Sequence, residues 1–289
     1  MNASPLRMEQ APNERKTYID LLQRSLSENR DQLVQQWRNP QGTSTRHFVL
    51  DNLLPEALCR RVYEAFPRDG NGFFSRDSFR EKKRTSANLE SYDPLLGDIT
   101  YAFQDPSIVA LVSDIVGFRN IKPDPMLYAG GLSMMFKGDF LNPHIDNSHD
   151  SSRKSYRRLN LLYYVSPNWV LENGGNFELW DSNRTVPKTL IAGNNRLVVM
   201  ETNKSSWHSV SPMLVDQARC CVSNYYFSEI SPDDTRYFHI TSFTGRPEEK
   251  LKRVLGTLDN GLRNFISRLL RTSRGRKFMN KVDKQPPGE

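Results

Sequence analysis

Long apolar runs and cysteines are scarce in this sequence, and each scarcity excludes a class of protein. No segment approaches the roughly 20 consecutive apolar residues that a membrane-spanning helix needs, and the first 16 residues lack the apolar stretch of an export signal. The three cysteines, Cys59, Cys220 and Cys221, are an odd number with two of them adjacent, which suits neither a disulfide framework nor a CxxC-type zinc site. We therefore expect a cytoplasmic protein with no transmembrane segment.

Surplus charge is also absent from most of the chain. Residues 245–289 hold 12 Lys/Arg against 5 Asp/Glu, whereas the rest of the chain holds 28 of each kind, so the net charge of +7 comes from this C-terminal tail. A basic tail does not by itself indicate that the preceding part of the chain handles nucleic acid. Such a tail is typical of a solvated face or a disordered end. The alternative is contact with an anionic surface such as a membrane, a nucleic acid or an acidic glycan.

The spacing of apolar residues predicts helices towards both ends of the chain. The expected N-terminal helices cover residues 15–37 (one helix or two), 55–66, 94–103 and 106–117. The same spacing between Leu251 and Leu270 predicts an amphipathic helix within the basic tail. Residues 68–93 are instead rich in Gly, Ser and charged side chains, which is typical of a long mobile loop.

The centre of the chain has the composition of strands. Segments rich in β-branched and aromatic residues alternate with Gly, Pro, Asn and Asp, which favours an antiparallel β architecture. The expected strands cover residues 46–50, 126–136, 158–165, 176–180, 196–200 and 219–227. This order predicts three parts: a helical extension over 1–45, a mainly β domain over 46–232, and a basic helical tail over 233–289.

The segment Asn142-Pro143-His144-Ile145-Asp146 holds a candidate metal site. In an extended chain, His144 and Asp146 point to the same face. Two imidazoles and one carboxylate on one face of an octahedron leave three positions open, an arrangement suited to iron(II) that must accept an oxo acid and dioxygen. An H-x-D pair alone is weak evidence, because with five histidines in the chain it arises by chance roughly one time in four.

Two later residues fit the same site. His208 lies 64 residues after His144, directly before a candidate strand, and can supply the second imidazole; the alternative is a loop or core histidine. Arg219 begins a strand 11 residues further on, where a guanidinium can grip a carboxylate with two hydrogen bonds. Of the remaining histidines, His47 and His239 are expected to be structural, and His149 is expected in a solvated polar loop rather than as a ligand.

With these residues in this order, the sequence resembles the prolyl 4-hydroxylase-like branch of the Fe(II)/2-oxoglutarate-dependent dioxygenase superfamily. The resemblance covers roughly residues 46–230. It also rests on Arg158-Leu-Asn-Leu-Leu-Tyr-Tyr-Val-Ser-Pro-Asn-Trp169 and on Glu172-Asn-Gly-Gly-Asn-Phe-Glu-Leu-Trp180. It implies a mainly β fold with flanking helices, the double-stranded β-helix (jelly roll, cupin-like), with residues 46–232 as the dioxygenase domain.

The resemblance also implies roles for individual residues. His144, Asp146 and His208 would hold Fe(2+). Arg219 would bind the distal carboxylate of 2-oxoglutarate together with the hydroxyl of Tyr164. The resemblance places one further cosubstrate-binding residue, Asn160, on the same cavity.

Two other segments are compared with the family pattern. Phe136 stands where relatives often have a tyrosine that touches the cosubstrate, so that one hydrogen bond is not available here. Arg84-Thr85-Ser86 is similar to a segment of the family's substrate-side loop. We expect the mouth of the cavity to be formed by residues 68–93 and 147–157.

The family resemblance implies hydroxylation of an unactivated carbon, with conversion of 2-oxoglutarate and O2 to succinate and CO2 and with ascorbate as a further candidate cofactor. A peptidyl substrate, prolyl included, and a small molecule remain equally open. The alternative is a jelly-roll metal-binding or sensing module without turnover, which would have no physical need for the complete ligand set and Arg219. A nucleic-acid demethylase would be expected to carry a second arginine soon after Arg219, and residues 220–227 contain none.

Overall fold

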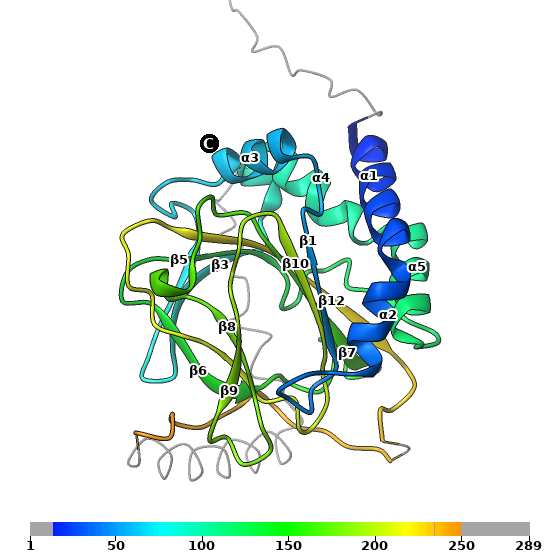
Figure 1. The fold of residues 1–289 in the computed structure, drawn as a ribbon, viewed down its shortest axis with the longest axis vertical. Coiled ribbons are helices and arrows are strands. Elements are labelled where there is room, and N and C mark those ends of the chain that lie inside the picture. The colour runs from blue at the N-terminus through cyan, green and yellow to red at the C-terminus, as the bar shows by residue number, and fades with distance from the viewer. Residues whose placement is uncertain (1–13, 234, 250–289) are drawn as a thin grey trace, which may run out of the picture.

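The structure is a computed structural model that describes residues 14–233 and 235–249. Helices gather on one side of a strongly curved sheet (Figure 1). They are α1 (Glu14–Glu28), α2 (Arg30–Arg38), α3 (Glu56–Ala65), α4 (Pro94–Ala102) and α5 (Pro106–Val116). Two short 3-10 helices lie elsewhere in the chain, η1 (Leu89–Ser91) before α4 and η2 (Leu171–Asn173) further along. The expected N-terminal helices agree with these elements, and residues 15–37 are divided between α1 and α2. The helix expected over 251–270 lies outside the described residues.

The sheet is antiparallel throughout. Its strands are β1 (His47–Asp51), β2 (Phe74–Asp77), β3 (Glu81–Ser86), β4 (Lys122–Pro123), β5 (Gly131–Met135), β6 (Phe140–Ile145), β7 (Tyr156–Tyr164), β8 (Phe177–Trp180), β9 (Pro187–Leu190), β10 (Arg196–Glu201), β11 (His208–Val210), β12 (Arg219–Ser228) and β13 (Ser242–Phe243). The main order is β1-β10-β7-β12-β5-β3-β6-β11-β8-β9. In this order, one half of the sheet consists of β1, β10, β7, β12 and β5, and the other half consists of β6, β11, β8 and β9. Strand β3 joins them, because its start pairs with β6 and its end with β5.

Two apolar cores lie on opposite faces of the larger half of the sheet. The first core packs α1 to α5 against the sheet and includes Leu161 and Tyr163 of β7. The second core lies inside the curved sheet and includes Tyr164 of β7 and Phe177 of β8. Because successive side chains of a strand point to opposite faces, β7 contributes to both cores. All nine residues of β7 are therefore shielded, and only Leu162 is not fully buried.

Local sequence signals account for the bounds of α4 and α5. Each helix has an aspartate at its N-cap and a proline at its first turn, where a missing N–H costs no helical hydrogen bond. Asp93 accepts a hydrogen bond from the Leu95 N–H at 2.9 Å, and Asp105 accepts one from the Ser107 N–H at 2.9 Å. Gly117 ends α5 in the left-handed conformation, with φ of 70°.

Residues 68–93 do not form the long loop that their composition predicted. Strands β2 and β3 form a hairpin there, and β3 bridges the two halves of the sheet. The prediction was wrong because β3 carries polar or charged side chains on both faces and so lacks the alternation that marks a half-buried strand. One of these faces lines a polar cavity, to which Lys83 and Thr85 contribute.

The chain returns to the sheet after residue 232. Strand β13 pairs with β6 and places Phe243 opposite His144. Three residues later, Arg246 donates a hydrogen bond to Glu178 of β8 at 2.7 Å. The division into parts at 45 and 232 stays a prediction.

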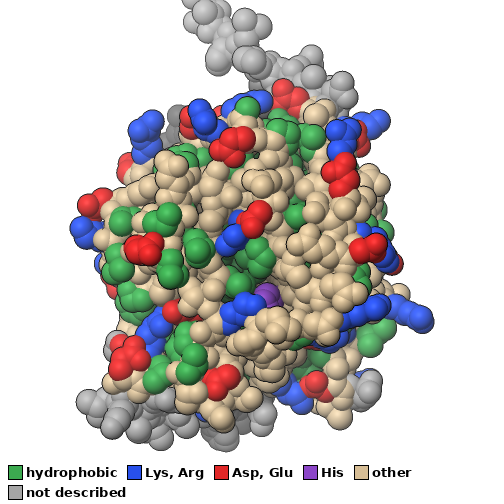
Figure 2. Space-filling view, in the orientation of Figure 1, with side chains coloured by type: hydrophobic (Ala, Val, Ile, Leu, Met, Phe, Trp, Pro, Cys, Tyr) green, Lys and Arg blue, Asp and Glu red, His purple; other side chains and the backbone are tan. Residues whose placement is uncertain are grey.

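The face of the molecule drawn in Figure 2 carries charges of both signs. Lys and Arg side chains are interspersed with Asp and Glu (Figure 2). Exposed ion pairs include Lys122 with Glu229 at 2.7 Å and Lys137 with Asp216 at 3.4 Å. Among the described residues, no helix is long and apolar enough to cross a membrane.

Candidate active site

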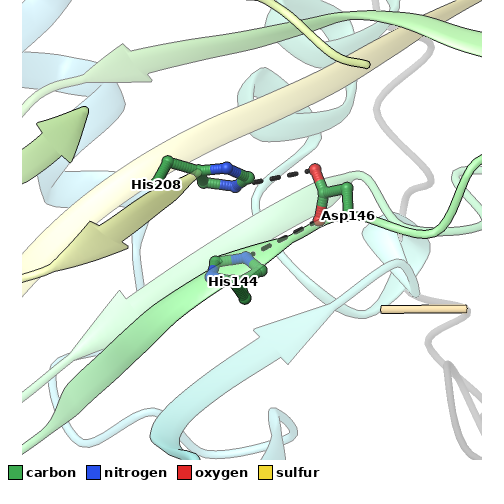
Figure 3. Close-up of side chains that lie close together, drawn as sticks. All are labelled: His144, Asp146 and His208. Carbon is green, nitrogen blue, oxygen red and sulfur yellow. Dashed lines mark ion pairs between the residues drawn. The ribbon is translucent and has the colours of Figure 1, made fainter. Parts of the chain in front are cut away.

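Three side chains from two neighbouring strands converge inside the curved sheet. His144 belongs to β6, Asp146 follows at the end of that strand, and His208 begins β11. The antiparallel pairing of β6 with β11 makes His144 and His208 direct register partners. Figure 3 shows both imidazoles directed at the Asp146 carboxylate, and one ligand atom from each of the three residues lies within 4.8 Å of the others.

Both histidines are held in the tautomer that a metal ligand needs. Nδ1 of His144 lies 3.0 Å from the Asn142 carbonyl oxygen, and Nδ1 of His208 lies 2.9 Å from the Ser206 carbonyl oxygen. A carbonyl can only accept, so each Nδ1 carries the proton and donates it. The lone pair therefore sits on each Nε2. These two nitrogens are each 3.7 Å from an oxygen of Asp146.

Burial sets the charge states of the three groups. Burial and the neighbouring His208 ring lower the pKa of His144 to about 3, and burial also lowers the pKa of His208. Burial raises the pKa of Asp146, but the Arg157 guanidinium and the two histidines more than offset this and hold that pKa below its usual range. The site therefore presents two neutral imidazoles and one carboxylate at neutral pH.

This donor set fits iron(II). Two imidazole nitrogens and one carboxylate oxygen form the ligand set of non-haem iron oxygenases, which leaves coordination positions for substrates. The Asp146 Oδ2 atom is buried and has no hydrogen-bond partner, although Arg157 Nη1 approaches it as an ion pair at 3.2 Å. A bound cation would satisfy that oxygen.

A cavity of about 90 Å³ joins the three residues to Arg219. Its walls come from β3, β5, β6, β7, β8, β11 and β12. The predicted site residues that line it are His144, Asp146, Asn160, Tyr164, His208 and Arg219. The structure therefore brings together all the residues that the sequence singled out for metal and cosubstrate.

Arg219 is suited to hold an anion at one end of this cavity. Its side chain is 4 % exposed, Nη1 donates to the Gly175 carbonyl oxygen at 3.0 Å, and the buried Nε has no hydrogen-bond partner. The guanidinium carbon lies 5.2 Å from the centre of the Tyr164 ring. Burial raises the pKa of Tyr164, so its hydroxyl keeps its proton and can donate. Two donors thus remain for a carboxylate.

Asn160 lies at the other end of the cavity. Its register partner on β12 is Tyr225, whereas Tyr164 pairs with Cys221, two residues from Arg219. The Asp146 charge is among the causes that raise the pKa of Tyr225, after burial, so this rung of the sheet lies beside the carboxylate ligand. Asn160 is 3 % exposed and its Oδ1 has no hydrogen-bond partner. It is therefore placed near the metal ligands rather than beside Arg219.

The two segments compared with the family pattern take different positions. Phe136 is not among the described residues that line the cavity; its ring packs under the Arg84 guanidinium at 4.3 Å. Within Arg84-Thr85-Ser86, Thr85 lines the cavity, while Arg84 turns towards Asp139 at 3.5 Å.

The other histidines lie outside the cluster. His149 is packed among aromatic rings: its ring centre lies 4.3 Å from that of Tyr156 and 5.6 Å from that of Phe238. Its Nδ1 atom is 2.7 Å from the Ser148 hydroxyl oxygen. His47 and His239 are likewise absent from the metal-binding group found among the described residues.

Two cations near the site were not singled out in the sequence. Arg157 is 2 % exposed and pairs with Asp146. Lys83 lines the cavity and forms an ion pair with Glu81 at 3.2 Å. No short sequence motif marks either residue, since both depend on how their strands are paired.

Comparison with known proteins finds a family match over the part of the chain that holds this site. Residues 130–227, which include all three candidate ligands and Arg219, match the model described as the 2OG-Fe(II) oxygenase superfamily. The mouse protein named prolyl 3-hydroxylase OGFOD1 is 28 % identical over 96 residues, which make up 31 % of this chain and 17 % of that protein. The matched part thus spans about a sixth of that relative.

One solved structure supports the fold. A structure of prolyl 4-hydroxylases from Phytophthora capsici is 16 % identical, covers 94 % of this chain and 83 % of its own, and gives a TM-score of 0.50. A prolyl hydroxylase from Trichoplax adhaerens, in complex with a hypoxia inducible factor peptide, is 15 % identical over 76 % of this chain and 95 % of its own, with a TM-score of 0.48. The predicted jelly-roll fold is confirmed. The predicted similarity to the iron and 2-oxoglutarate oxygenases is confirmed over residues 130–227. Over about a third of its length, the chain is thus similar to the 2OG-Fe(II) oxygenase superfamily.

Proposed function

We propose that this chain is an Fe(II)- and 2-oxoglutarate-dependent hydroxylase in which His144, Asp146 and His208 hold the iron. The observation that carries the proposal is the convergence of two Nε2 lone pairs and a buried carboxylate on one point inside the cavity. Iron bound there would supply the oxidising chemistry, converting 2-oxoglutarate and O2 to succinate and CO2 while a carbon of the substrate is hydroxylated.

The protein would orient the cosubstrate between two ends of the cavity. The unpartnered Nε of Arg219 and the Tyr164 hydroxyl can both donate to the distal carboxylate. Asn160, on the rung beside Tyr225, would contact the end nearer the iron. The apolar side chains among the mixed lining, which include Leu141, Phe177 and Val210, would exclude water from the reacting groups.

We further propose that the substrate is peptidyl, with prolyl residues included, or a small molecule. The name of the mouse relative, a prolyl 3-hydroxylase, supports a prolyl substrate. We also propose that residues 46–232 form the dioxygenase domain and that ascorbate is a further cofactor. The basic tail is proposed to contact an anionic surface. The described cysteines, all free, support a cytoplasmic location.

Succinate formation tests the proposed function. Purified protein loaded with iron(II) without oxygen would be given 2-oxoglutarate and then O2, because slow turnover of 2-oxoglutarate without substrate needs no knowledge of the substrate. We expect succinate from the wild type and none from His144→Ala. For Arg219→Ala we expect a KM for 2-oxoglutarate at least about 30-fold higher, as for loss of a buried charge pair worth about 2 kcal/mol or more.

His149→Ala is the matched control. It removes a buried histidine five residues from His144 that takes no part in the cluster. We expect this variant to form succinate at the wild-type rate. Iron-loaded wild type that neither forms succinate nor binds 2-oxoglutarate would overturn the proposal.

A further inference from the structure

Arg157 places a positive charge directly against a candidate iron ligand. Its side chain is 2 % exposed, and Nη1 lies 3.2 Å from the Asp146 Oδ2 atom. The guanidinium carbon lies over the Tyr225 ring, 4.0 Å from its centre, so the positive charge rests against the face of an aromatic side chain. Tyr225 itself lines the cavity. The guanidinium is thus held between the ring below it and the carboxylate beside it.

A β-bulge turns Arg157 towards Asp146. Along β7, Leu159 pairs with Tyr226 of β12, but the next rung pairs Arg157 with Phe227, so Arg158 is the extra residue. Strict alternation would have put Arg157 on the helix-covered face with Leu159. The bulge exchanges the faces to which the two arginine side chains point. The Arg158 guanidinium carbon lies 4.2 Å from the centre of the Phe118 ring, which packs against the first core, while the Arg157 side chain points to the site.

Burying Arg157 in this way costs stability. Its Nε and Nη2 atoms are buried and have no hydrogen-bond partner, and an unpaired buried donor is unfavourable. Replacing such an ion pair by apolar side chains is often neutral or stabilising. A stabilising role is therefore a poor explanation for a charge at this place. Its contact with Asp146 points instead to a role at the site.

We propose that Arg157 is a positioning residue, whose guanidinium, stacked on Tyr225, fixes the Asp146 carboxylate towards His144 and His208 before the metal binds. Asp146 lies just beyond the end of β6, so the strand ladder does not fix its backbone as it fixes His144. Outer partners of a metal ligand contribute to affinity by holding it in place. The inference rests on the proposed iron site.

Metal affinity separates this role from general stability. Co(2+) alone would be titrated calorimetrically into metal-free wild type, Arg157→Met and Arg158→Met, and the visible spectrum of the Co(2+) form and the unfolding midpoint of the metal-free protein would be recorded. Arg158 is the matched control, since it is the next residue of the same strand and is 8 % exposed, yet faces the helices.

We expect Co(2+) affinity to fall by about 10- to 100-fold in Arg157→Met, with a changed spectrum, and to stay within about 2-fold of wild type in Arg158→Met. Equal affinity of Arg157→Met and wild type, or an equal loss in Arg158→Met, would overturn the inference. Wild type that binds no Co(2+) would instead overturn the proposed function.

If Arg157→Met does not fold, the same measurements would be made on Arg157→Lys. Lysine keeps the positive charge but presents a point donor without a flat face to lie on Tyr225. We expect weaker Co(2+) binding and a changed spectrum in this variant too. A lysine variant that matches wild type in both measurements would overturn the role of the stacked guanidinium.

Discussion

On the helix-covered face of the sheet, both polar side-chain atoms of the buried Asn195 are hydrogen-bonded. Its Oδ1 accepts from the Tyr163 hydroxyl at 2.9 Å and from the Leu54 N–H at 3.0 Å, and its Nδ2 donates to the Leu54 carbonyl oxygen at 2.6 Å. On the cavity face of β7, Asn160 is equally buried, yet its Oδ1 has no partner. The two asparagines occupy similar depths in very different states.

The same contrast extends to charged groups. Unpartnered buried atoms beside the cavity include Asp146 Oδ2, Arg157 Nε and Arg219 Nε. Native proteins leave few such atoms, because each costs about 1–3 kcal/mol. The helix-covered side also holds such atoms, Trp37 Nε1 and Arg158 Nε among them, but those beside the cavity gather around the candidate ligands. Three measurements test this difference.

The largest effect is expected from adjacent leucines of β7. Leu161 is buried in the first core, whereas Leu162 is only partly buried and lines the cavity. Leu161→Ala should lower the free energy of unfolding by about 2–5 kcal/mol, and Leu162→Ala by clearly less. Urea denaturation of the metal-free variants would measure both. Equal losses would show that the two faces are packed alike.

The asparagines give a second test of the comparison. Asn195→Ala should cost about 2–4 kcal/mol, because it leaves groups of Leu54 and Tyr163 unpaired and puts alanine at φ of 55°. Asn160→Leu should leave the unfolding free energy unchanged or higher, while weakening 2-oxoglutarate binding measured by calorimetry. A destabilised Asn160→Leu variant would mean that Asn160 has an unrecognised partner.

The smallest effect concerns protonation outside the cavity. Burial lowers the pKa of His149 to about 4 and also lowers the pKa of His47, both from an ordinary value of 6.5. The unfolded chain therefore takes up protons first as the pH falls. The stabilisation is complete above about pH 6.5 and is lost as the pH falls towards the folded values, by up to about 1.4 kcal/mol per pH unit for each histidine.

Urea midpoints of metal-free protein at several pH values would measure this loss. His149→Gln should show a shallower decline between about pH 6.5 and pH 4 than wild type, because one of the protonating groups is gone. Identical pH profiles for the two proteins would contradict the prediction.

Much of the β domain could be predicted because its strands alternate or are apolar throughout. The expected segments 158–165, 176–180, 196–200 and 219–227 agree with β7, β8, β10 and β12 to within a residue or two. The candidate ligands were also accessible, since a His-x-Asp pair, a later histidine and an arginine at a strand start each have a chemical reason. Those residues meet at one cavity.

Other features depend on pairing that no local pattern records. Strand β3 looks like a loop because one of its faces serves a polar cavity, which removes the apolar alternation. Arg157 looks like a residue of the helix-covered face because its direction is set by a bulge opposite Tyr226 and Phe227. Asn160 was expected on the cavity, but its place along the cavity follows only from the register of β7 and β12.

His144 and His208 are register partners although 64 residues separate them in the chain. During synthesis at roughly 5–20 residues per second, His144 and Asp146 therefore precede His208 by roughly 3–13 seconds. For that time the nascent chain holds only two of the three ligands. Binding of iron by all three ligands of the proposed site can then begin only once β11 has left the ribosome. Strand β12, which completes the cavity wall, follows directly after it, so the full ligand set and its enclosure form within a short interval of synthesis.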